Sequence, residues 1–379
     1  MFKLKSKPIS CLLLLLACTL NNLSGCSSIP ATNIESSQTE VEQIQASKIA
    51  LDGRDKFNSN AQYAEIGNKQ YVFFERSEGL NFKDKSIHLS EIVDKQKAVE
   101  KISPTTQFTQ NKQFSTLSGL VKEKERQWLY FTYGDSIRKK PATILKGQVM
   151  PDGRLTAVTQ VTLNHDIEVG SWPYFHYHNG QYYMVYRKIK CCELGFAVSE
   201  NGTDFTSTNQ SGFKGFMPAI ASFGDGSLIY TYQRTFPTDQ LRSNGKVKYT
   251  LKSRYQISHD QGQTWQPEKI VTDTTFTVHD AIPFLRQDGN IDLYYSHGFN
   301  RKIGHWSLWR RCVNSQGDLG KEYLVADESI GHIAKPNVFR RTDGRIVLLF
   351  SEQGEEIRNG SQQTFSILNS DADCQFNKD

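Results

Sequence analysis

Short runs of β-branched and aromatic residues recur along the chain and are separated by polar turns. Four of them are QYYMVYRK (181–188), SLIYTYQR (227–234), IDLYYSHG (291–298) and RIVLLFSE (345–352). Valine, isoleucine and aromatic residues fit the pleated surface of a sheet, so these runs are typical of strands. No convincing amphipathic helix follows residue 50, and the pattern predicts an all-β fold.

The same unit repeats in the second half of the chain. Each copy has an early proline, an Asn-Gly or Asp-Gly turn and a strand ending on an aromatic residue six positions after the glycine. The four copies are Pro173, Asn179-Gly180, Tyr186; Pro218, Asp225-Gly226, Tyr232; Pro283, Asp288-Gly289, Tyr295; and Pro336, Asp343-Gly344, Phe350. Such turns favour tight hairpins, because glycine adopts the required positive φ at little cost.

Two weaker copies precede these four, around Phe74 and Tyr133. Successive terminal aromatics are then 46 to 63 residues apart, which is enough for four strands per unit. Six such units predict a six-bladed β-propeller, because radial closure leaves only short, protected sheet edges. A two-sheet sandwich is the alternative architecture.

Residues 258–265 read SHDQGQTW. This segment resembles the Asp-box, Ser-X-Asp-X-Gly-X-Thr-Trp, at every specified position, and degenerate copies occupy 199–205 and 369–376. The resemblance is to the sialidase-like propeller superfamily and covers roughly residues 50–379 as architecture. It implies a turn between the third and fourth strands of a blade, in which side chains satisfy backbone N–H groups and the tryptophan packs between blades.

The N-terminus has the features of an export signal. Three lysines precede an apolar run at 11–20 that is too short to span a bilayer. Leu23-Ser24-Gly25-Cys26 then resembles a bacterial lipobox, which implies lipidation of Cys26. Cys18 is a weaker candidate, since cleavage there would truncate the apolar run. A soluble secreted protein with an incidental Cys26 is the alternative.

These features divide the chain into a signal peptide (1–25), a polar flexible tether (26–49) and a propeller domain (50–379). Ser27, rather than aspartate, follows the lipobox cysteine, and resemblance to sorted lipoproteins implies an outer-membrane address, at the cell surface or the periplasmic face. Acyl chains would supply the membrane anchor. Removal of the signal lowers the formal charge from +5 to +2, because three lysines are lost, so nucleic acid is not an indicated partner. We expect a monomer.

Four cysteines besides Cys26 remain in the mature chain, namely Cys191, Cys192, Cys312 and Cys374. Export favours their pairing, and four cysteines allow three connectivities. The adjacent Cys191-Cys192 pair lacks zinc-like spacing, so we favour structural disulfides or buried thiols and expect neither a metal nor a cofactor.

In propellers of this superfamily, ligands bind where first strands begin and second strands end, on the face opposite the Asp-boxes. In this sequence those positions are rich in cations, histidines and carboxylates, which suits an anionic sugar because guanidinium groups bind carboxylate or sulfate bidentately. The alternative is that charged residues are frequent at these positions only because strand ends are exposed to solvent. The catalytic candidates are His279, Asp280, His297 and Glu352, and the substrate-binding candidates are Arg187, Arg234, Lys335 and Trp172.

His279 and His297 are 18 residues apart across one predicted hairpin, and we expect them to face a common pocket. Either histidine can act as acid or base near neutral pH. Asp280 is a candidate general acid if it is partly desolvated, or else a capping aspartate. Trp172 either stacks on a sugar ring or packs between blades.

Sialidases bind the substrate carboxylate with an arginine triad and use a tyrosine nucleophile, a glutamate and an aspartate acid. No Arg-Ile-Pro or Arg-Leu-Pro motif occurs in this sequence. Arg76, Arg187 and Arg234, with Tyr186 or Tyr232, match these roles by residue type alone.

A second resemblance is to ulvan-lyase-type propellers, which have longer chains and an extra blade. His279 with His297 resembles their histidine pair and Arg187 their arginine, while Trp172 stands in place of their tyrosine. This implies elimination, with Arg187 or Arg234 neutralising a uronate carboxylate and His279 as base. The preferred hypothesis is a surface-anchored exo-glycoside hydrolase acting on anionic glycans. A polysaccharide lyase and a non-catalytic glycan-binding lipoprotein are the alternatives.

Overall fold

The computed structural model contains only β-strands among the elements that it describes. It describes residues 57–77, 85–94, 97–105, 108, 114–134, 143–164, 169–170, 173–189, 192–208, 213–241, 243–274, 277–298, 306–327, 332–353, 362–368 and 374–376. All of them belong to one compact unit, residues 39–379. Within these ranges there is no helix of the length and hydrophobicity that a membrane span requires.

The strands form six sheets, which we number as blades in chain order. Blade 1 holds β1 (Phe57–Ile66), β2 (Lys69–Ser77), β3 (Ser86–Asp94) and β4 (Lys97–Lys101), and blade 2 holds β5 (Phe114–Glu123), β6 (Arg126–Gly134), β7 (Thr143–Val149) and β8 (Leu155–Gln160). Blade 3 holds β10 (Tyr174–His178), β11 (Gln181–Arg187), β12 (Leu194–Ser199), β13 (Asp204–Ser207) and, parallel to β13, β9 (Thr162–Leu163).

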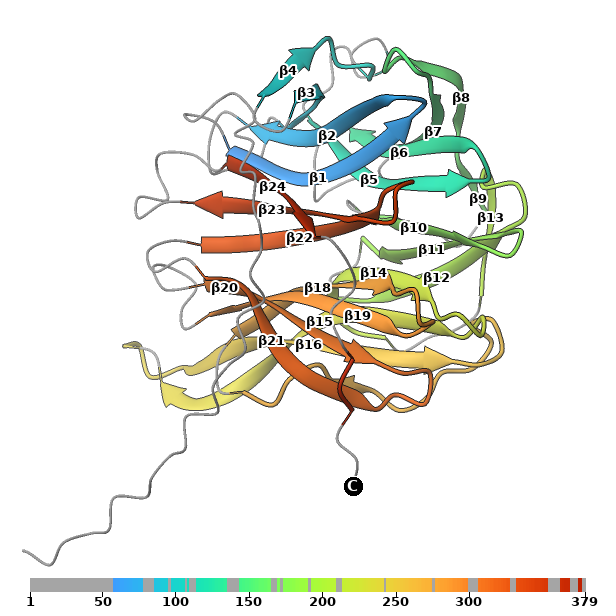
Figure 1. Ribbon diagram of the computed structural model, residues 1–379. Coiled ribbons are helices and arrows are strands. Elements are labelled where there is room, and N and C mark those ends of the chain that lie inside the picture. Colours follow the sequence, from blue (N-terminus) through green and yellow to red (C-terminus); the bar gives the residue numbers. More distant parts are fainter. Residues whose placement is uncertain are drawn as a thin grey trace, which may run out of the picture. The chain divides into compact units, whose positions relative to one another are not determined.

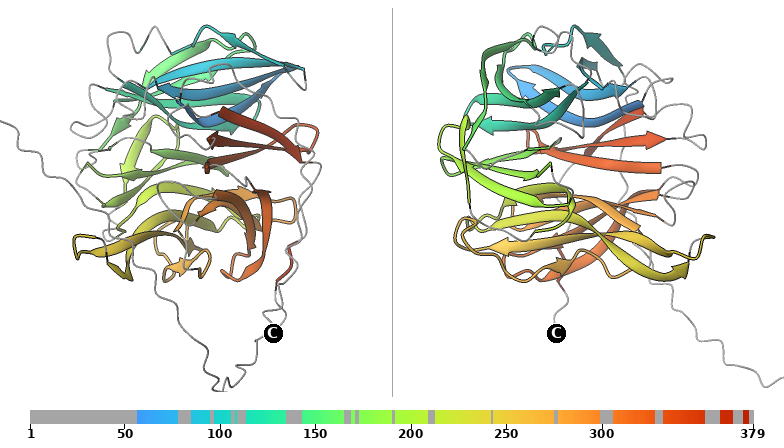
Figure 2. Two further views of the ribbon diagram at one scale, coloured as in Figure 1. Left: turned by 90° about the vertical axis from the view of Figure 1, so that its left-hand side faces the viewer. Right: turned by 180° about the vertical axis from the view of Figure 1, so that it is seen from behind.

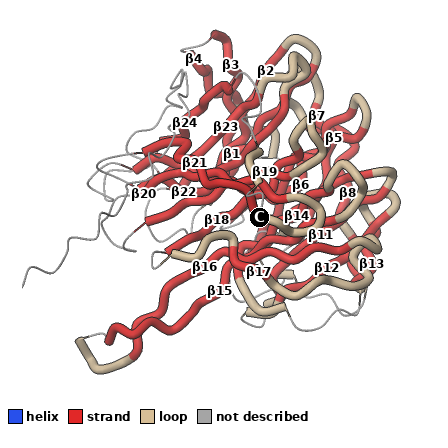
Figure 3. Tube along the Cα trace, turned by 60° about the horizontal axis from the view of Figure 1, so that its bottom comes forward, coloured by secondary structure: helices blue, strands red, loops and turns tan. Residues whose placement is uncertain are grey.

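Blade 4 holds β14 (Phe216–Ser222), β15 (Leu228–Leu241), β16 (Val247–Ser258) and β17 (Lys269–Ile270). Blade 5 holds β18 (Thr277–Leu285), β19 (Ile291–Gly298), β20 (Trp306–Val313) and β21 (Leu319–Asp327), and blade 6 holds β22 (His332–Arg340), β23 (Ile346–Gln353) and β24 (Gln362–Leu368). The β15–β16 hairpin is the longest, and its tip projects beyond the neighbouring strands (Figure 3).

The first strands of the blades form a closed ring. Contacts run from β1 to β5, β10, β14, β18 and β22 in turn, and β22 contacts β1 again. The first and last blades therefore lie side by side, as β1 in blue and β22–β24 in red show (Figures 1 and 2). This arrangement confirms the predicted six-bladed propeller, although the described residues of blade 6 form three strands where the repeat predicts four.

The hydrophobic core is divided among the interfaces between blades. Six separate clusters of buried residues occur, and each joins two neighbouring blades. In β23, Val347 and Leu349 pack toward blade 1, whereas Leu348 and Phe350 pack toward blade 5. Successive strand residues point to opposite faces, and both faces are buried, which explains why the second strands read as continuous apolar runs.

The segment Ser258–Trp265 connects β16 with β17. Asp260 accepts hydrogen bonds from the backbone N–H of Thr264 at 2.8 Å and from its hydroxyl at 2.6 Å, and Ser258 Oγ accepts one from Gly262 at 2.8 Å. The Trp265 ring lies 5.6 Å from the ring of Phe196 in blade 3. The turn therefore satisfies its own backbone and stabilises the contact between blades 3 and 4. The degenerate segment 369–376 lies largely outside the described residues.

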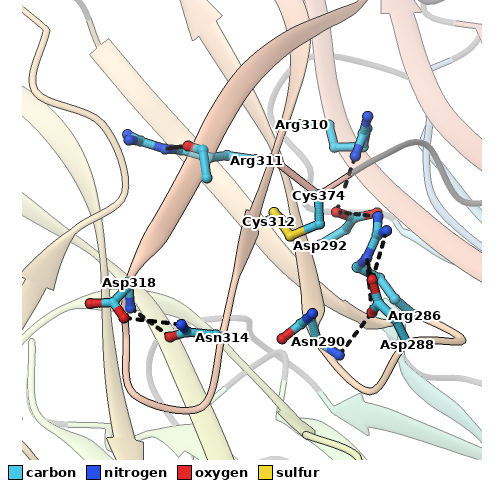
Figure 4. The surroundings of a disulfide bond; sticks show 11 residues. Arg286, Asp288, Asn290, Asp292, Arg310, Arg311, Cys312, Asn314, Asp318 and Cys374 are labelled. Atoms are coloured by element: carbon cyan, nitrogen blue, oxygen red, sulfur yellow. Dashed lines mark hydrogen bonds and ion pairs between the residues drawn. A yellow bond between two sulfur atoms is a disulfide. The ribbon is translucent and has the colours of Figure 1, made fainter. Parts of the chain in front are cut away.

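The C-terminal segment is attached to blade 5. Cys374 forms a disulfide with Cys312 of β20 (Figure 4). The Lys321 backbone N–H also donates a hydrogen bond to the Gln375 carbonyl at 2.8 Å. Beside it, buried Asp292 accepts hydrogen bonds from Arg286 and Arg310. This pairing selects one of the three possible connectivities, and Cys192 is disulfide-bonded as well.

We predict that replacing both Cys312 and Cys374 by alanine lowers the free energy of unfolding by about 2–4 kcal/mol, because the bond restricts a long loop of the unfolded chain. Urea unfolding followed by tryptophan fluorescence measures the change. Reductant should lower the midpoint of the double variant by less than that of the wild type, because only the disulfide of Cys192 remains. Equal midpoints would show that the backbone bonds of residues 374–376 hold this segment without the disulfide.

Candidate functional site

Four of the first strands carry the same β-bulge. In blades 1, 4, 5 and 6, two residues of the first strand lie opposite one aromatic residue of the second strand. The first residue of each bulge has a left-handed backbone, namely Asn60 (φ 52°), Met217 (φ 47°), Asp280 (φ 59°) and Lys335 (φ 53°). The aromatic residues opposite the four bulges are terminal aromatics of the sequence repeat, namely Phe74, Tyr232, Tyr295 and Phe350. Bulges of this kind redirect a side chain.

These four bulge residues converge on one cavity of about 60 Å³, which we call the hub cavity. Ser118, in an irregular step of β5, and Pro173 at the start of blade 3 also line it. The hub cavity therefore receives residues from all six blades, at the strand ends where the sequence predicts a ligand site.

Asp280 links three blades through its carboxylate. Gln233 of blade 4 donates to Oδ1 at 2.8 Å, and the Lys335 backbone N–H of blade 6 donates to Oδ2 at 3.3 Å. His279 Nδ1 lies 3.0 Å from the same Oδ2. Burial raises the pKa of Asp280, but the charge and hydrogen bond of His279, the charge of Lys335 and the Gln233 amide outweigh it and hold the pKa well below its usual range. Asp280 is therefore an ionised acceptor, and this charge state disfavours the general-acid role.

Glu75 is the second buried carboxylate near the hub. It is fully buried and accepts hydrogen bonds from Asn60 Nδ2 at 2.9 Å and from the Leu117 backbone N–H of blade 2 at 3.0 Å. It also forms an ion pair with the buried ammonium of Lys85. Burial raises the pKa of Glu75, but the charges of Lys85 and Lys335 outweigh it and lower the pKa below its usual range. Glu75 thus ties blade 1 to blade 2 as Asp280 ties blades 4, 5 and 6.

Lys335 lines the hub cavity and is half-buried. Its ammonium has no hydrogen-bond or ion-pair partner in the part of the chain that the structure describes. Burial lowers its pKa to about 8, with a further contribution from Lys85, and the carboxylates of Glu75 and Asp280 oppose this change. A cationic group thus lies beside a cavity, and the carboxylates of Asp280, which lines the cavity, and of buried Glu75 are already engaged by other groups.

The expectation that His279 and His297 face a common pocket is wrong. His279 pairs with Ser296, while Val278 pairs with His297, so the two rings point to opposite faces of blade 5. Without the bulge the two histidines would be directly opposite each other, and the extra residue moves His279 to the other face. The ring of His279 packs on that of Trp306, with the two ring centroids 4.4 Å apart, whereas His297 lies near Trp309 and Thr274.

Arg234 points away from the hub cavity. It forms an ion pair at 2.9 Å with Glu268, which also accepts the Tyr232 hydroxyl at 2.6 Å. Arg76, likewise two positions after a terminal aromatic, pairs in the same way with Glu100 at 3.0 Å. Both arginines therefore bridge strands within a blade.

The two candidate nucleophiles, Tyr186 and Tyr232, are buried between blades, and burial raises the pKa of each. Neither tyrosine lines the hub cavity. The structure therefore places neither of these two tyrosines at the site, although another tyrosine, Tyr174 of β10, lines the hub cavity.

The other predicted residues are placed only in part. Arg187 ends β11 and does not line the hub cavity. Trp172 and Cys26 lie outside the described residues, as does the side chain of Glu352, whose backbone belongs to β23. Their predicted roles stay predictions.

Several residues of the site are absent from the sequence-based candidates, namely Asn60, Glu75, Lys85, Met217 and Gln233. Glu75 and Gln233 share a signal, since each directly follows a terminal aromatic. No group of three or more His, Cys, Asp or Glu residues suited to a metal ion occurs within the described ranges.

Known proteins resemble this chain in fold rather than in sequence. No model of a known protein family matches it, and no curated protein does. A protein of unknown function from Dyadobacter fermentans DSM 18053 matches with a TM-score of 0.61 at 9% identity, over 86% of this chain and 98% of that one. The NanB sialidase from Streptococcus pneumoniae matches with a TM-score of 0.56 at 12% identity, over 86% of this chain and 70% of that one. The Hadza microbial sialidase Hz136 matches with a TM-score of 0.53 at 10% identity, over 82% of this chain and 65% of that one. The chain thus has the sialidase-like propeller fold.

Asp280→Asn tests the hub carboxylate. Asparagine tolerates the left-handed backbone and still accepts the Gln233 hydrogen bond. Its NH2 group replaces Oδ2, so the change removes the charge together with the acceptor for the Lys335 backbone N–H and for His279. A pKa held below the ordinary 3.8 contributes stability above about pH 4 that is lost as the pH falls. We therefore expect the variant to be less stable than the wild type at pH 7 and the difference to shrink toward pH 3. Urea unfolding at several pH values measures this, and a difference independent of pH would contradict the assignment.

Proposed function

We propose that the protein is a carbohydrate-active enzyme, a sialidase-like exo-glycoside hydrolase that acts on an anionic glycan at the hub cavity. The observation that carries this proposal is the convergence of left-handed bulge residues, Asp280 and Lys335 among them, on a cavity at the hub. Strained backbone and β-bulges are enriched beside active sites. Two of the solved structures that share the fold are sialidases.

Lys335 is proposed to bind the carboxylate of the sugar. Its ammonium is cationic at neutral pH, and a charge-assisted hydrogen bond to a carboxylate compensates its partial burial. The site would use a lysine where sialidases use an arginine triad, which fits the engagement of Arg76 and Arg234 in other ion pairs.

His279 is proposed as the proton-transfer residue. Its ring does not itself line the hub cavity, and Asp280, which does, is its link to the cavity. If Nδ1 carries the proton donated to Asp280, Nε2 is the nitrogen left for acid–base chemistry, and the carboxylate stabilises the imidazolium that forms. The separation of His279 from His297 removes the feature that favoured an eliminase, so hydrolysis is the function that we retain.

Incubation with sialylated and uronate-containing glycans, followed by mass spectrometry, tests the activity. Hydrolysis adds one water across the cleaved bond, whereas elimination does not. We expect release of a terminal acidic sugar with the added water. Binding without any release would identify a glycan-binding protein instead.

His279→Ala should lower kcat by about 100-fold or more, the contribution typical of general acid–base catalysis. His297→Ala is the matched control on the same hairpin and should change kcat by only a few fold. Equal losses in both variants, with unchanged folding by circular dichroism, would contradict the proposed role of His279.

Lys335→Met should lower kcat/KM for an acidic sugar by about 10- to 100-fold, since a hydrogen bond to a charged group contributes about 1.5–3 kcal/mol. Lys246→Met, in the exposed turn between β15 and β16, is the control and should have no effect. An unchanged KM for Lys335→Met would exclude the lysine as a carboxylate ligand.

We also propose that lipid on Cys26 anchors the protein in the outer membrane and that the folded chain is monomeric. Cys26→Ala should move the protein from the membrane to the soluble fraction and abolish labelling by an alkyne fatty acid. Cys18→Ala is the control and should remain labelled and anchored. Membrane retention of Cys26→Ala would overturn this anchor.

A further inference from the structure

Lys335 combines three features that few lysines share. It lines an internal cavity, its ammonium has no partner in the described part of the chain, and its left-handed bulge fixes the direction of its Cα–Cβ bond. A flexible surface lysine has none of these constraints.

The charged groups around Lys335 leave it available for chemistry. Glu75 is engaged by Lys85 and Asn60, and the Asp280 carboxylate accepts Gln233, His279 and a backbone N–H. Lys85 is a second cation close enough to oppose protonation of Lys335, as burial also does. A desolvated lysine beside another cation is a known way to activate an amine as a nucleophile.

We propose that Lys335 is a nucleophilic lysine that condenses with a small aldehyde, such as the open-chain aldehyde of a short sugar. The amine lone pair forms the C–N bond while the C=O π electrons move to oxygen. One proton passes from nitrogen to that oxygen through solvent and gives a hydroxyl. The hydroxyl then takes the second N–H proton and leaves as water as the C=N bond forms. Amine and aldehyde thus give imine and water, with no change in oxidation state. The hub cavity of about 60 Å³ has room for the aldehyde group and few further heavy atoms, just as it would hold only the acidic group of the glycan proposed above.

Reductive trapping tests the proposal on the full-length protein. Glycolaldehyde with cyanoborohydride converts each imine into a stable secondary amine, and peptide mass spectrometry identifies the modified lysine. At pH 7.5 we expect Lys335 to be labelled roughly ten-fold faster than exposed Lys124 or Lys246, because a larger fraction of its amine is unprotonated. Its labelling rate should level off above about pH 8. Labelling no faster than the exposed lysines, or a rate still rising toward pH 10, would overturn the proposal.

Two variants complete the test. Lys335→Arg should lose the adduct on that peptide and leave labelling of the other lysines unchanged. Lys85→Met removes the neighbouring cation and should shift the labelling midpoint of Lys335 to higher pH, while an unshifted midpoint in the folded variant would contradict the role of Lys85. If Lys85→Met does not fold, the wild-type pH profile decides. Trapping is measured without glycan cleavage, so its failure and the failure of the proposed hydrolase activity are distinguishable.

Discussion

The hub depends on one backbone constraint, the insertion of two residues of a first strand opposite a single aromatic of the second. A non-glycine residue in the left-handed region costs of order 1–3 kcal/mol, and it persists only where the surroundings fix it. Here the opposing aromatic is packed between two blades, and the inner strand cannot slip without breaking both interfaces. Asparagine and aspartate adopt this conformation comparatively easily, whereas methionine and lysine do so rarely. The conformational free-energy cost of the left-handed backbone is therefore higher at Met217 and Lys335 than at Asn60 and Asp280. Lys335 is also the cation beside the hub cavity.

Buried carboxylates then join the bulges to one another. Glu75 and Gln233 both directly follow a terminal aromatic, and each reaches the first strand of the following blade. The residue after the aromatic thus faces the next blade, while the residue two positions after it, Arg76 or Arg234, faces the outer strands of its own blade. This alternation follows from the period of two along a strand. Residues that link neighbouring blades at the hub therefore alternate along the strand with residues that stabilise a single blade.

Much of the fold is predictable because its signals are local. Each Asn-Gly or Asp-Gly hairpin and its terminal aromatic lie within a few residues, and their recurrence predicts six blades without knowledge of any long-range contact. Asp280 and Lys335 are predictable for the same reason, since they directly precede the repeated strand features. Pairing across a hairpin is not predictable in this way. Counting residues from the turn places His279 opposite His297, and one inserted residue, invisible in the sequence, reverses the outcome. Glu75 is missed because it accepts a hydrogen bond from Leu117 of another blade, and Lys85 because its partner Glu75 lies on the neighbouring strand of its own blade.

The charge state of Asp280 limits how the hub can transfer protons. A carboxylate that accepts three hydrogen bonds, beside His279 and Lys335, is stabilised in its ionised form and cannot readily donate a proton. It can orient the ring of His279 by accepting a hydrogen bond from Nδ1. In the function proposed above, His279 transfers the proton and Asp280 orients its ring. The same carboxylate holds blades 4, 5 and 6 together. The same carboxylate thus couples the geometry of the ring to the chemistry of the cavity, and a change that loosens the hub would also misplace the histidine.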